Sequence, residues 1–469
     1  MQREKALAHN TAIIMLGKIC TQGISFLLLP LYTSILSQEE YGIFDLMITY
    51  STLFLPLVNW QFDQGVFRFL LDHRGDDDGI KTVFSTVLFS CIIQTIAYAC
   101  ILLAVNYFHP VQHLLFLLIY VSLLMYTGLL LQFSRGIGSS KTYAVASFIS
   151  ATMTVVLNVI ALVILHLGVQ GLFLSCIIGQ LSALAYLSIK NSIWRYINLK
   201  NYDRSTYRQI SRYSIPLIPN NLAWWVVNAS DRMVINHYIG IAANGIYTVA
   251  CKFPNVFITF YNSVNLSWTE SVSLHFNDDD RDTFLNEVMM VFFKLFSSCC
   301  FMIIALMPFV FPIMVNIKFS ISYNHIYILM MAMLFRVLVG LYSCIYVAQK
   351  QSGKVATTSI AAAIINLSVD LILVGKIELY AASVSTLVAF LVMFIVRYID
   401  VNRSINLKIE TKSLILTLAL GICLGIVYYS GNQYCQLITL VLVLIYSIGA
   451  NYKTIKAGGR LVRRFFQKS

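Results

Sequence analysis

The chain has 469 residues, of which 58% are hydrophobic and only 12% carry a charge, and its mean hydropathy is +0.75. Soluble domains carry about 25% charged residues, so this composition excludes a soluble globular protein and predicts an integral membrane protein. The net charge of +12 would suit a nucleic-acid partner if the basic residues formed a patch, but they are spread over the loops between apolar runs.

Apolar runs of about 20 residues, the length that crosses a bilayer as a helix, predict an all-α polytopic membrane protein with about fourteen transmembrane helices. The first run is too long for the core of a signal peptide, and no small-residue cleavage site follows it, so we expect it to be retained. The predicted spans begin near Asn10, Gly42, Thr82, Gln112, Thr142, Val169, Ser214, Gly245, Glu287, Ser322, Val355, Leu379, Leu414 and Asn432.

Basic residues between the spans, among which we count Arg397, fall almost entirely in one set of alternate loops, and the tail KTIKAGGRLVRRFFQKS adds to that set. The opposite set of loops holds only Lys318 and Lys376. Because loops that stay in the cytoplasm are enriched in Lys and Arg, we expect both termini to be cytoplasmic. The excess of positive charge is then a sign of topology, and no nucleic-acid partner is expected.

The two halves of the chain are similar to each other. Gly42-Ile43-Phe44 aligns with Gly245-Ile246-Tyr247, and LNVIALVILHLGVQG around Asn158 aligns with INLSVDLILVGKIEL around Asn366. The similar offsets predict a duplicated six-span unit whose two copies have the same orientation, an arrangement typical of transporters that rock two bundles about a central site. The predicted organisation is an N-lobe at 1–190, a cytoplasmic linker at 191–213, a C-lobe at 214–402, and two last spans with the basic tail at 403–469.

Charged residues inside the predicted spans are the candidate functional residues. With a rise of about 1.5 Å per helical residue, Arg68 lies near a cytoplasmic end of its span, and Asp45 and Asp370 lie near outer ends. Buried charges normally pair with one another or line a water-filled cavity. A surplus of deep positive charge therefore predicts an anionic substrate, bound by the four deepest cations: Lys18, Arg232, Lys252 and Arg336.

The stretch WWVVNASDRMVINHYIG allows two interpretations. In the first, Arg232 faces the cavity and Asp231 holds a neighbouring cation in place. In the second, Asp231 pairs with Lys252 of the next span while Arg232 extends toward the membrane surface. Aromatic and amide side chains that meet sugar rings by stacking and hydrogen bonding lie nearby. The residues expected to support the site are Asp231, Arg68, Asp63, Asn228 and Trp224.

Metal, cofactor and nucleotide chemistry have no visible basis in the sequence. The ten cysteines include no CxxC and lie mostly in predicted spans, where a small buried side chain is their expected role. The phosphate-binding pattern GxxxxGK[ST] does not occur. We therefore expect no catalytic residue, no metal site and no cofactor.

Three segments resemble the Wzx-type polysaccharide and O-antigen flippases of the multidrug/oligosaccharidyl-lipid/polysaccharide exporter superfamily. They are LPLYTSILSQEEYGIFDL, YSIPLIPNNLAWWVVNASDRMVINHYIG and NGIYTVACKF, and the resemblance runs from about residue 8 to residue 400. One departure is GKIELYAAS at 375–383, where the family usually has a run of small residues.

The resemblance implies transport of a polyprenyl-pyrophosphate-linked oligosaccharide across the bacterial plasma (inner) membrane, through a cationic cavity between two six-helix lobes. The implied partners are this lipid-linked oligosaccharide, membrane lipids and the polysaccharide polymerase machinery. One alternative is an H⁺- or Na⁺-coupled drug exporter of the same superfamily, which needs deep carboxylates. Another is a membrane glycan polymerase or ligase, which needs a large outward loop.

Overall fold

The computed structural model describes residues 23, 26–276, 278–403, 405 and 411–466, and this part of the chain is helical, with no β-strand. The α-helices are α2 (Leu29–Ile35), α3 (Gln38–Val58), α4 (Phe62–Asp72), α5 (Asp77–Phe108), α6 (Leu114–Gly136), α7 (Ser140–Val159), α8 (Gly168–Lys190), α9 (Arg204–Ser214), α10 (Ile218–Tyr238), α11 (Ile241–Leu274), α12 (Arg281–Met314), α13 (Tyr323–Ala348), α14 (Ser352–Ile377), α15 (Tyr380–Asn402), α16 (Thr411–Ser430) and α17 (Gln433–Phe466).

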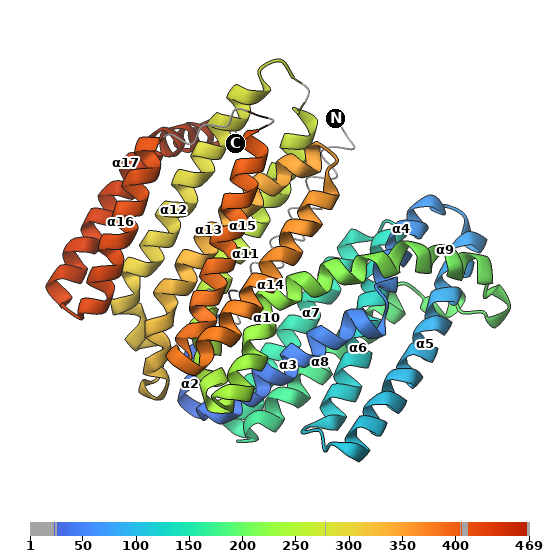
Figure 1. Ribbon diagram of the computed structural model, residues 1–469. Coiled ribbons are helices and arrows are strands. Elements are labelled where there is room, and N and C mark those ends of the chain that lie inside the picture. The colour runs from blue at the N-terminus through green and yellow to red at the C-terminus, as the bar shows by residue number, and fades with distance from the viewer. Residues whose placement is uncertain (1–22, 24–25, 277, 404, 406–410, 467–469) are drawn as a thin grey trace. The chain divides into compact units, whose positions relative to one another are not determined.

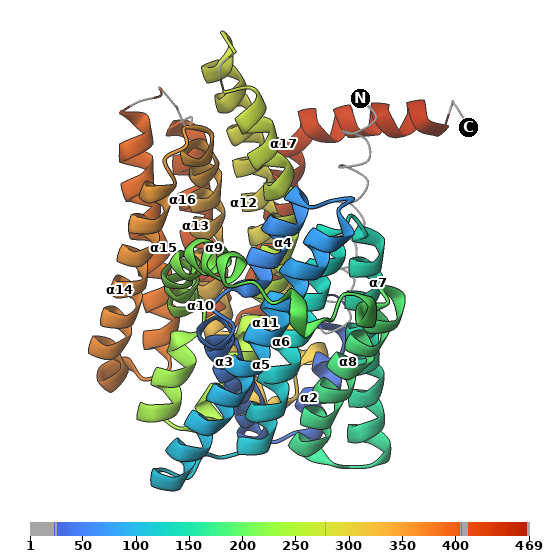
Figure 2. The same cartoon turned by 90° about the vertical axis from the view of Figure 1, so that its right-hand side faces the viewer.

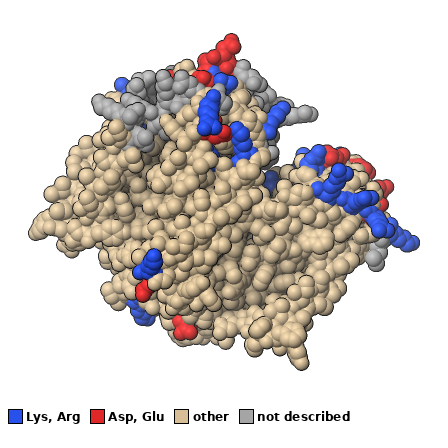
Figure 3. Space-filling model, viewed as in Figure 1, with Lys and Arg blue, Asp and Glu red and all other residues tan. Residues whose placement is uncertain are grey.

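Ten helices in the described residues are long and apolar enough to cross a membrane, which confirms a polytopic membrane protein. Helices α10 and α11 are not among the ten, because amides, prolines and charged residues lower their hydropathy. The first predicted span falls mostly outside the described residues, so the count of fourteen stays a prediction. On the face shown in Figure 3, charged side chains gather at the helix ends and the broad middle is free of them.

The helices form two compact units. One holds Ile35–Met233, and the other holds Leu29–Ser34 with the described residues from Val234 onward. In the first unit α6 packs against α3, α5 and α8, and α7 packs against α8 (Figure 1). In the second unit α13 packs against α11, α12 and α15, α14 packs against α15, and α16 and α17 cover α12. The four pairs formed by α3 and α5–α8 thus correspond in chain order to the four pairs formed by α11–α15.

The second predicted span is broken into α3 and α4. Between them, Trp60 and Gln61 have φ values of 50° and 58°, in the left-handed region that interrupts a helix. The amide of Asn59 spans the break, because its Oδ1 accepts a hydrogen bond from the Gln61 N–H at 2.8 Å and its Nδ2 donates to Asp63 at 3.1 Å. From the sequence, this segment was expected to be one continuous span.

The segment that the sequence analysis described as a linker is folded against the first unit. Its helix α9 packs against α4 and α5, with Ile210 fully buried. The Asp203 carboxylate caps α9 by accepting hydrogen bonds from the N–H groups of Ser205 and Thr206. Ahead of the helix, the Asp203 N–H donates to Thr86 Oγ1 at 3.0 Å. Residues 191–213 are therefore held against α4 and α5 by apolar packing and by a hydrogen bond to Thr86.

Small residues allow α15 to pack closely against its neighbours in the second unit. Figure 2 shows α14 and α15 side by side, in agreement with their packing. Ala381, Ala382 and Ser383, the last three residues of GKIELYAAS, are fully buried. Small side chains let membrane helices approach closely, so this departure does not prevent tight packing of α15.

Candidate functional site on helices α3 and α10

One face of α10 is polar along most of its length. Asn221, Trp225, Asn228 and Arg232 recur at intervals of four, three and four residues, which places them on one side of a helix. They cover about 16 Å along the helix axis. Such a stripe is costly in hydrocarbon and is expected to face either other polar groups or water.

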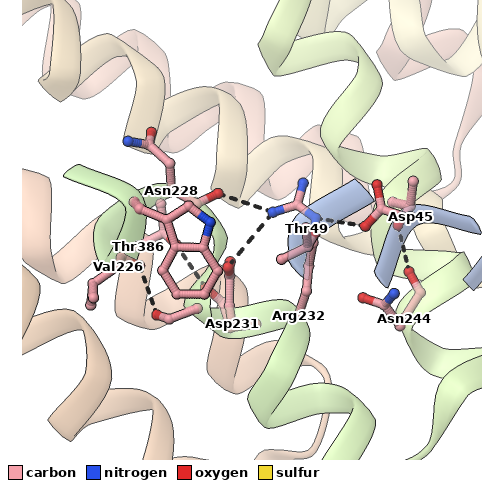
Figure 4. A network of polar contacts seen from close by, with 12 residues as sticks. Asp45, Thr49, Val226, Asn228, Asp231, Arg232, Asn244 and Thr386 are labelled. Atoms are coloured by element: carbon pink, nitrogen blue, oxygen red, sulfur yellow. Dashed lines mark hydrogen bonds and ion pairs between the residues drawn. The ribbon is translucent and has the colours of Figure 1, made fainter. Parts of the chain in front are cut away.

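Arg232 is held by three groups of its own unit. Its Nε donates to Asp45 Oδ2 on α3 at 2.7 Å, its NH1 group donates to the Asn228 carbonyl oxygen at 3.0 Å, and the same NH1 lies 3.9 Å from Asp231 Oδ1. Figure 4 shows the guanidinium extending from α10 between Asp45 and Asn228. Only 12% of the Arg232 side chain and 18% of the Asp45 side chain are exposed. The pair is therefore mostly removed from solvent, where charge-assisted hydrogen bonds are strong.

Two further hydrogen bonds join α10 to α3 and to the break that follows α3. Trp225 Nε1 donates to Thr52 Oγ1 at 3.2 Å, and Asn221 Nδ2 donates to Gln61 Oε1 at 2.9 Å. The partners run in opposite chain directions along the two helices, from Asp45 opposite Arg232 to Gln61 opposite Asn221. We call these three pairs the polar seam. It ends at the break between α3 and α4.

The predicted deep cations are distributed over both units. Arg232 lies in the first unit, whereas Lys252 on α11 and Arg336 on α13 lie in the second. Both second-unit cations are half-buried, and the Arg336 guanidinium lies 5.6 Å from the centre of the Phe390 ring and contacts Met333 Sδ. Lys18 lies outside the described residues.

The predicted supporting residues have different surroundings. Arg68 forms an exposed ion pair with Asp72 at 2.7 Å on α4, so it is a surface residue. Asp63 accepts hydrogen bonds from Asn59 and Gln64 at the start of α4. Asn228 is exposed and donates to the carbonyl oxygen of half-buried Trp224 at 2.5 Å, along its own helix.

Two charged residues have surroundings that differ from those expected from the sequence. Asp45 was expected near the outer end of its span and was not paired with a cation, but it is the partner of Arg232, so Arg232 does not extend alone toward the membrane surface. Arg397 was counted among the loop residues, but it is fully buried in α15. Neither position was visible in the sequence, because span boundaries can be located only to within a turn or two and the helices that face each other are unknown.

The described residues contain no group of three or more His, Cys, Asp or Glu side chains that could hold a metal ion. The polar seam instead offers one guanidinium, one carboxylate, two amide side chains, a hydroxyl group and an indole N–H. These groups can bind and orient a polar solute by hydrogen bonds and charge.

A family model described as "Polysaccharide biosynthesis protein" matches residues 7–268, more than half of the chain. The chain belongs to this family. The match includes the polar seam, Asp231 and Lys252.

The succinoglycan biosynthesis transport protein ExoT of Rhizobium meliloti is a relative, with 24% identity over 265 residues. The match covers 54% of this chain and 50% of the relative, so the chain spans about half the length of the curated relative that it matches.

Solved structures of two transporters have the same fold. The lipid II flippase MurJ in an inward closed conformation superposes with a TM-score of 0.72 at 15% identity, over 96% of this chain and 100% of that one. An inward-facing multidrug resistance MATE family transporter of the MOP superfamily superposes with a TM-score of 0.67 at 14% identity, over 84% and 98%. The chain is thus a multi-pass membrane protein of the polysaccharide biosynthesis protein family, with the fold of these two transporters.

Proposed function

We propose that this protein is a flippase that moves a polyprenyl-pyrophosphate-linked oligosaccharide, such as an O-antigen or capsule repeat unit, from the cytoplasmic to the outer leaflet of the bacterial inner membrane. The main observation in support of this proposal is the polar seam, which has the Asp45–Arg232 pair at one end. A lipid-linked sugar has a charged pyrophosphate and many hydroxyl groups, and the seam offers a guanidinium together with amide and indole donors to the two kinds of group.

The proposed architecture is the one expected from the sequence: fourteen spans, two six-helix lobes that alternate access to a central site, and cytoplasmic termini. The correspondence of helix pairs in the two units supports the duplication on which this architecture rests. So does the burial of Asn158 on α7 and Asn366 on α14, which occupy matching positions of the two sequence repeats. We propose Lys18, Arg232, Lys252 and Arg336 as the cations that meet the pyrophosphate.

The direction of transport follows from the charge of the substrate. A pyrophosphate diester carries about two negative charges, and moving one charge across 100 mV is worth about 2.3 kcal/mol. With the inside negative, outward movement of the anion is favoured by about 5 kcal/mol at that potential. This bias drives net flipping without nucleotide hydrolysis.

One observation favours the second candidate, an ion-coupled drug exporter. Such a transporter needs carboxylates within its spans, and two mostly buried ones lie beside Arg232: Asp45 on α3 and Asp231 on α10. Neither carboxylate is needed to attract an anion, although Asp45 is well placed to fix the orientation of the guanidinium.

A deletion strain separates the two candidates. Loss of the flippase makes the lipid-linked oligosaccharide accumulate in the inner leaflet, as measured by its accessibility to an enzyme or probe added on the cytoplasmic side of inverted vesicles. If the lipid-linked oligosaccharide distributes normally and the strain becomes sensitive to cationic drugs, the exporter is correct and the flippase is wrong.

A further inference from the structure

The second unit contains a cavity of about 380 Å³ between the ends of α14 and α15 that the proposed transport cycle does not use. Its polar lining includes Lys354 at the start of α14, Asp400 near the end of α15, and Arg403 directly after α15. Its apolar lining includes Val396 and Ile399, which are 46% and 48% exposed. In a membrane protein, exposed apolar side chains on a spanning helix face lipid, so the cavity lies where lipid chains meet a charged helix end.

The charge of this cavity is positive. Lys354 Nζ donates to Asp400 Oδ2 at 2.8 Å, and Tyr346 Oη donates to the same oxygen at 2.9 Å. Asp400 therefore balances one cation, while Arg403 is exposed at the rim. Nearly half of the Lys354 side chain is exposed, so its ammonium group can contact a ligand without leaving Asp400.

A third cation lies behind the cavity wall. The guanidinium of the fully buried Arg397 donates from Nε and NH2 to Thr358 Oγ1, at 3.0 and 2.8 Å. It also donates to the carbonyl oxygens of Val339 and Val355 and to the hydroxyl groups of Ser343 and Ser359, and all of these acceptors are uncharged. Thr358 lines the cavity. The charge of Arg397 is separated from the cavity only by the Thr358 side chain. It therefore adds to the positive potential that Lys354 and Arg403 produce inside the cavity.

We propose that this cavity binds the phosphate headgroup of an anionic membrane phospholipid, with its acyl chains along Val396 and Ile399. Lys354 and Arg403 contact the phosphate oxygens, Thr357 offers a hydroxyl group, and Arg397 adds to the attraction. Basic pockets between spanning helices at the cytoplasmic side are suited to such headgroups, and the basic loops place this end of α14 and α15 in the cytoplasm. The bound lipid would join α14 to α15 in a membrane rich in anionic lipid. This inference goes beyond the proposed flipping of a lipid-linked sugar.

The test uses the purified full-length chain with dioleoyl phosphatidylglycerol or dioleoyl phosphatidylcholine, followed by native mass spectrometry of the retained lipid. We expect phosphatidylglycerol to be retained selectively. Each cation near a membrane surface is worth about 1 kcal/mol of lipid attraction, so Lys354→Gln and Arg403→Gln should each weaken retention about fivefold, and the double variant about thirtyfold. Lys376→Gln, at the exposed opposite end of α14, is the matched control and should retain the lipid normally.

Asp400→Asn tests the proposal in the opposite direction, because removal of the negative charge should strengthen retention of phosphatidylglycerol. A normal thermal melting temperature of each variant in phosphatidylcholine shows that the variants are folded. Inorganic phosphate and glycerol phosphate distinguish a lipid site from a site for free phosphate, since neither should displace the lipid at millimolar concentration. Equal retention of the two lipids, unchanged retention in the double variant, or displacement by free phosphate would overturn the proposal.

Discussion

At the scale of single residues, the contacts of Arg232 explain how a charge is accommodated in the apolar stretch WWVVNASDRMVINHYIG. The guanidinium is held by Asp45 on a neighbouring helix and by the carbonyl oxygen of Asn228 one turn earlier on its own helix. A charge that is fixed in this way needs no rearrangement when a substrate arrives, which is how preorganised sites gain affinity. Asp45 therefore acts as a positioning residue in the proposed site.

Arg232→Ala should lower the amount of folded protein. It leaves the mostly buried Asp45 carboxylate without its closest cation, and breaking a buried pair costs about 3 kcal/mol or more. Asp45→Asn/Arg232→Gln removes both charges and keeps most of the side-chain volume, so it should restore much of the thermal stability, as measured by melting of the purified protein in detergent.

Arg68→Ala is the matched control for that experiment. Arg68 also pairs with a carboxylate at 2.7 Å, but the side chains are 48% and 61% exposed, and exposed pairs contribute little to stability. A melting temperature that falls as much for Arg68→Ala as for Arg232→Ala would show that the burial of the Asp45–Arg232 pair has no energetic consequence.

The stability of the first turn of α9 should depend on pH, because the Asp203 carboxylate caps this helix. The pKa of the Asp203 carboxyl group is lowered mainly by hydrogen bonds from Thr206 and, to a smaller extent, by the hydrogen bond from the Ser205 N–H. Its stabilising effect is therefore complete above the ordinary pKa of about 4 and is lost as the pH falls through the lowered value of the folded state. We expect amide exchange at Ser205 and Thr206 to speed up at low pH, beyond its intrinsic pH dependence, in the wild-type protein. In Asp203→Ala the exchange should already be fast at neutral pH. Equal exchange protection in the two proteins at neutral pH would exclude this role for the carboxylate.

At the scale of helices, the packing of α11 against α13 depends on the absence of a side chain at Gly340. A Cβ atom at this position would overlap the hydroxyl group of Tyr261, which is buried and donates to Asn265 Oδ1 at 2.7 Å. Overpacking of this kind costs about 1–3 kcal/mol. Gly340→Ala should therefore lower the melting temperature.

Gly128→Ala on α6 is the control for Gly340→Ala, since nothing lies within 4 Å of its added Cβ. Alanine is the better helix former by about 1 kcal/mol, so this variant should be neutral or slightly more stable. Equal destabilisation by the two alanines would show that close helix packing at Gly340 is unimportant.

The helices themselves could be predicted well from hydropathy, and the contacts between them could not. Described helices begin within six residues of the predicted starts of thirteen spans, the largest difference being Arg281 for a span placed at Glu287. The break at Trp60 and Gln61 was missed, because it depends on backbone angles that the Asn59 side chain stabilises locally. The seam of α10 was only partly visible: Asn221, Trp225 and Arg232 stood out by residue type, but their partners Gln61, Thr52 and Asp45 depend on which helix faces α10.

At the scale of the whole molecule, the distribution of basic loops predicts the orientation in the membrane. A reporter enzyme that is active only in the cytoplasm should be active when fused after Ser469 and inactive when inserted near Asn106. The opposite pattern at Ser469 would mean that the number of spans is odd, with an error in the region of α16 and α17.

The central claim is that this protein moves an anionic lipid-linked oligosaccharide outward with the help of Arg232. The most direct test is complementation of the deletion strain with Asp45→Asn/Arg232→Gln, followed by measurement of the lipid-linked oligosaccharide that remains in the inner leaflet. We predict that the double variant reaches nearly normal abundance in the membrane but leaves the intermediate in the inner leaflet, at least tenfold above the wild-type level. If the double variant clears the intermediate as fast as the wild-type protein, Arg232 and Asp45 form a structural pair only, and the proposed site is wrong.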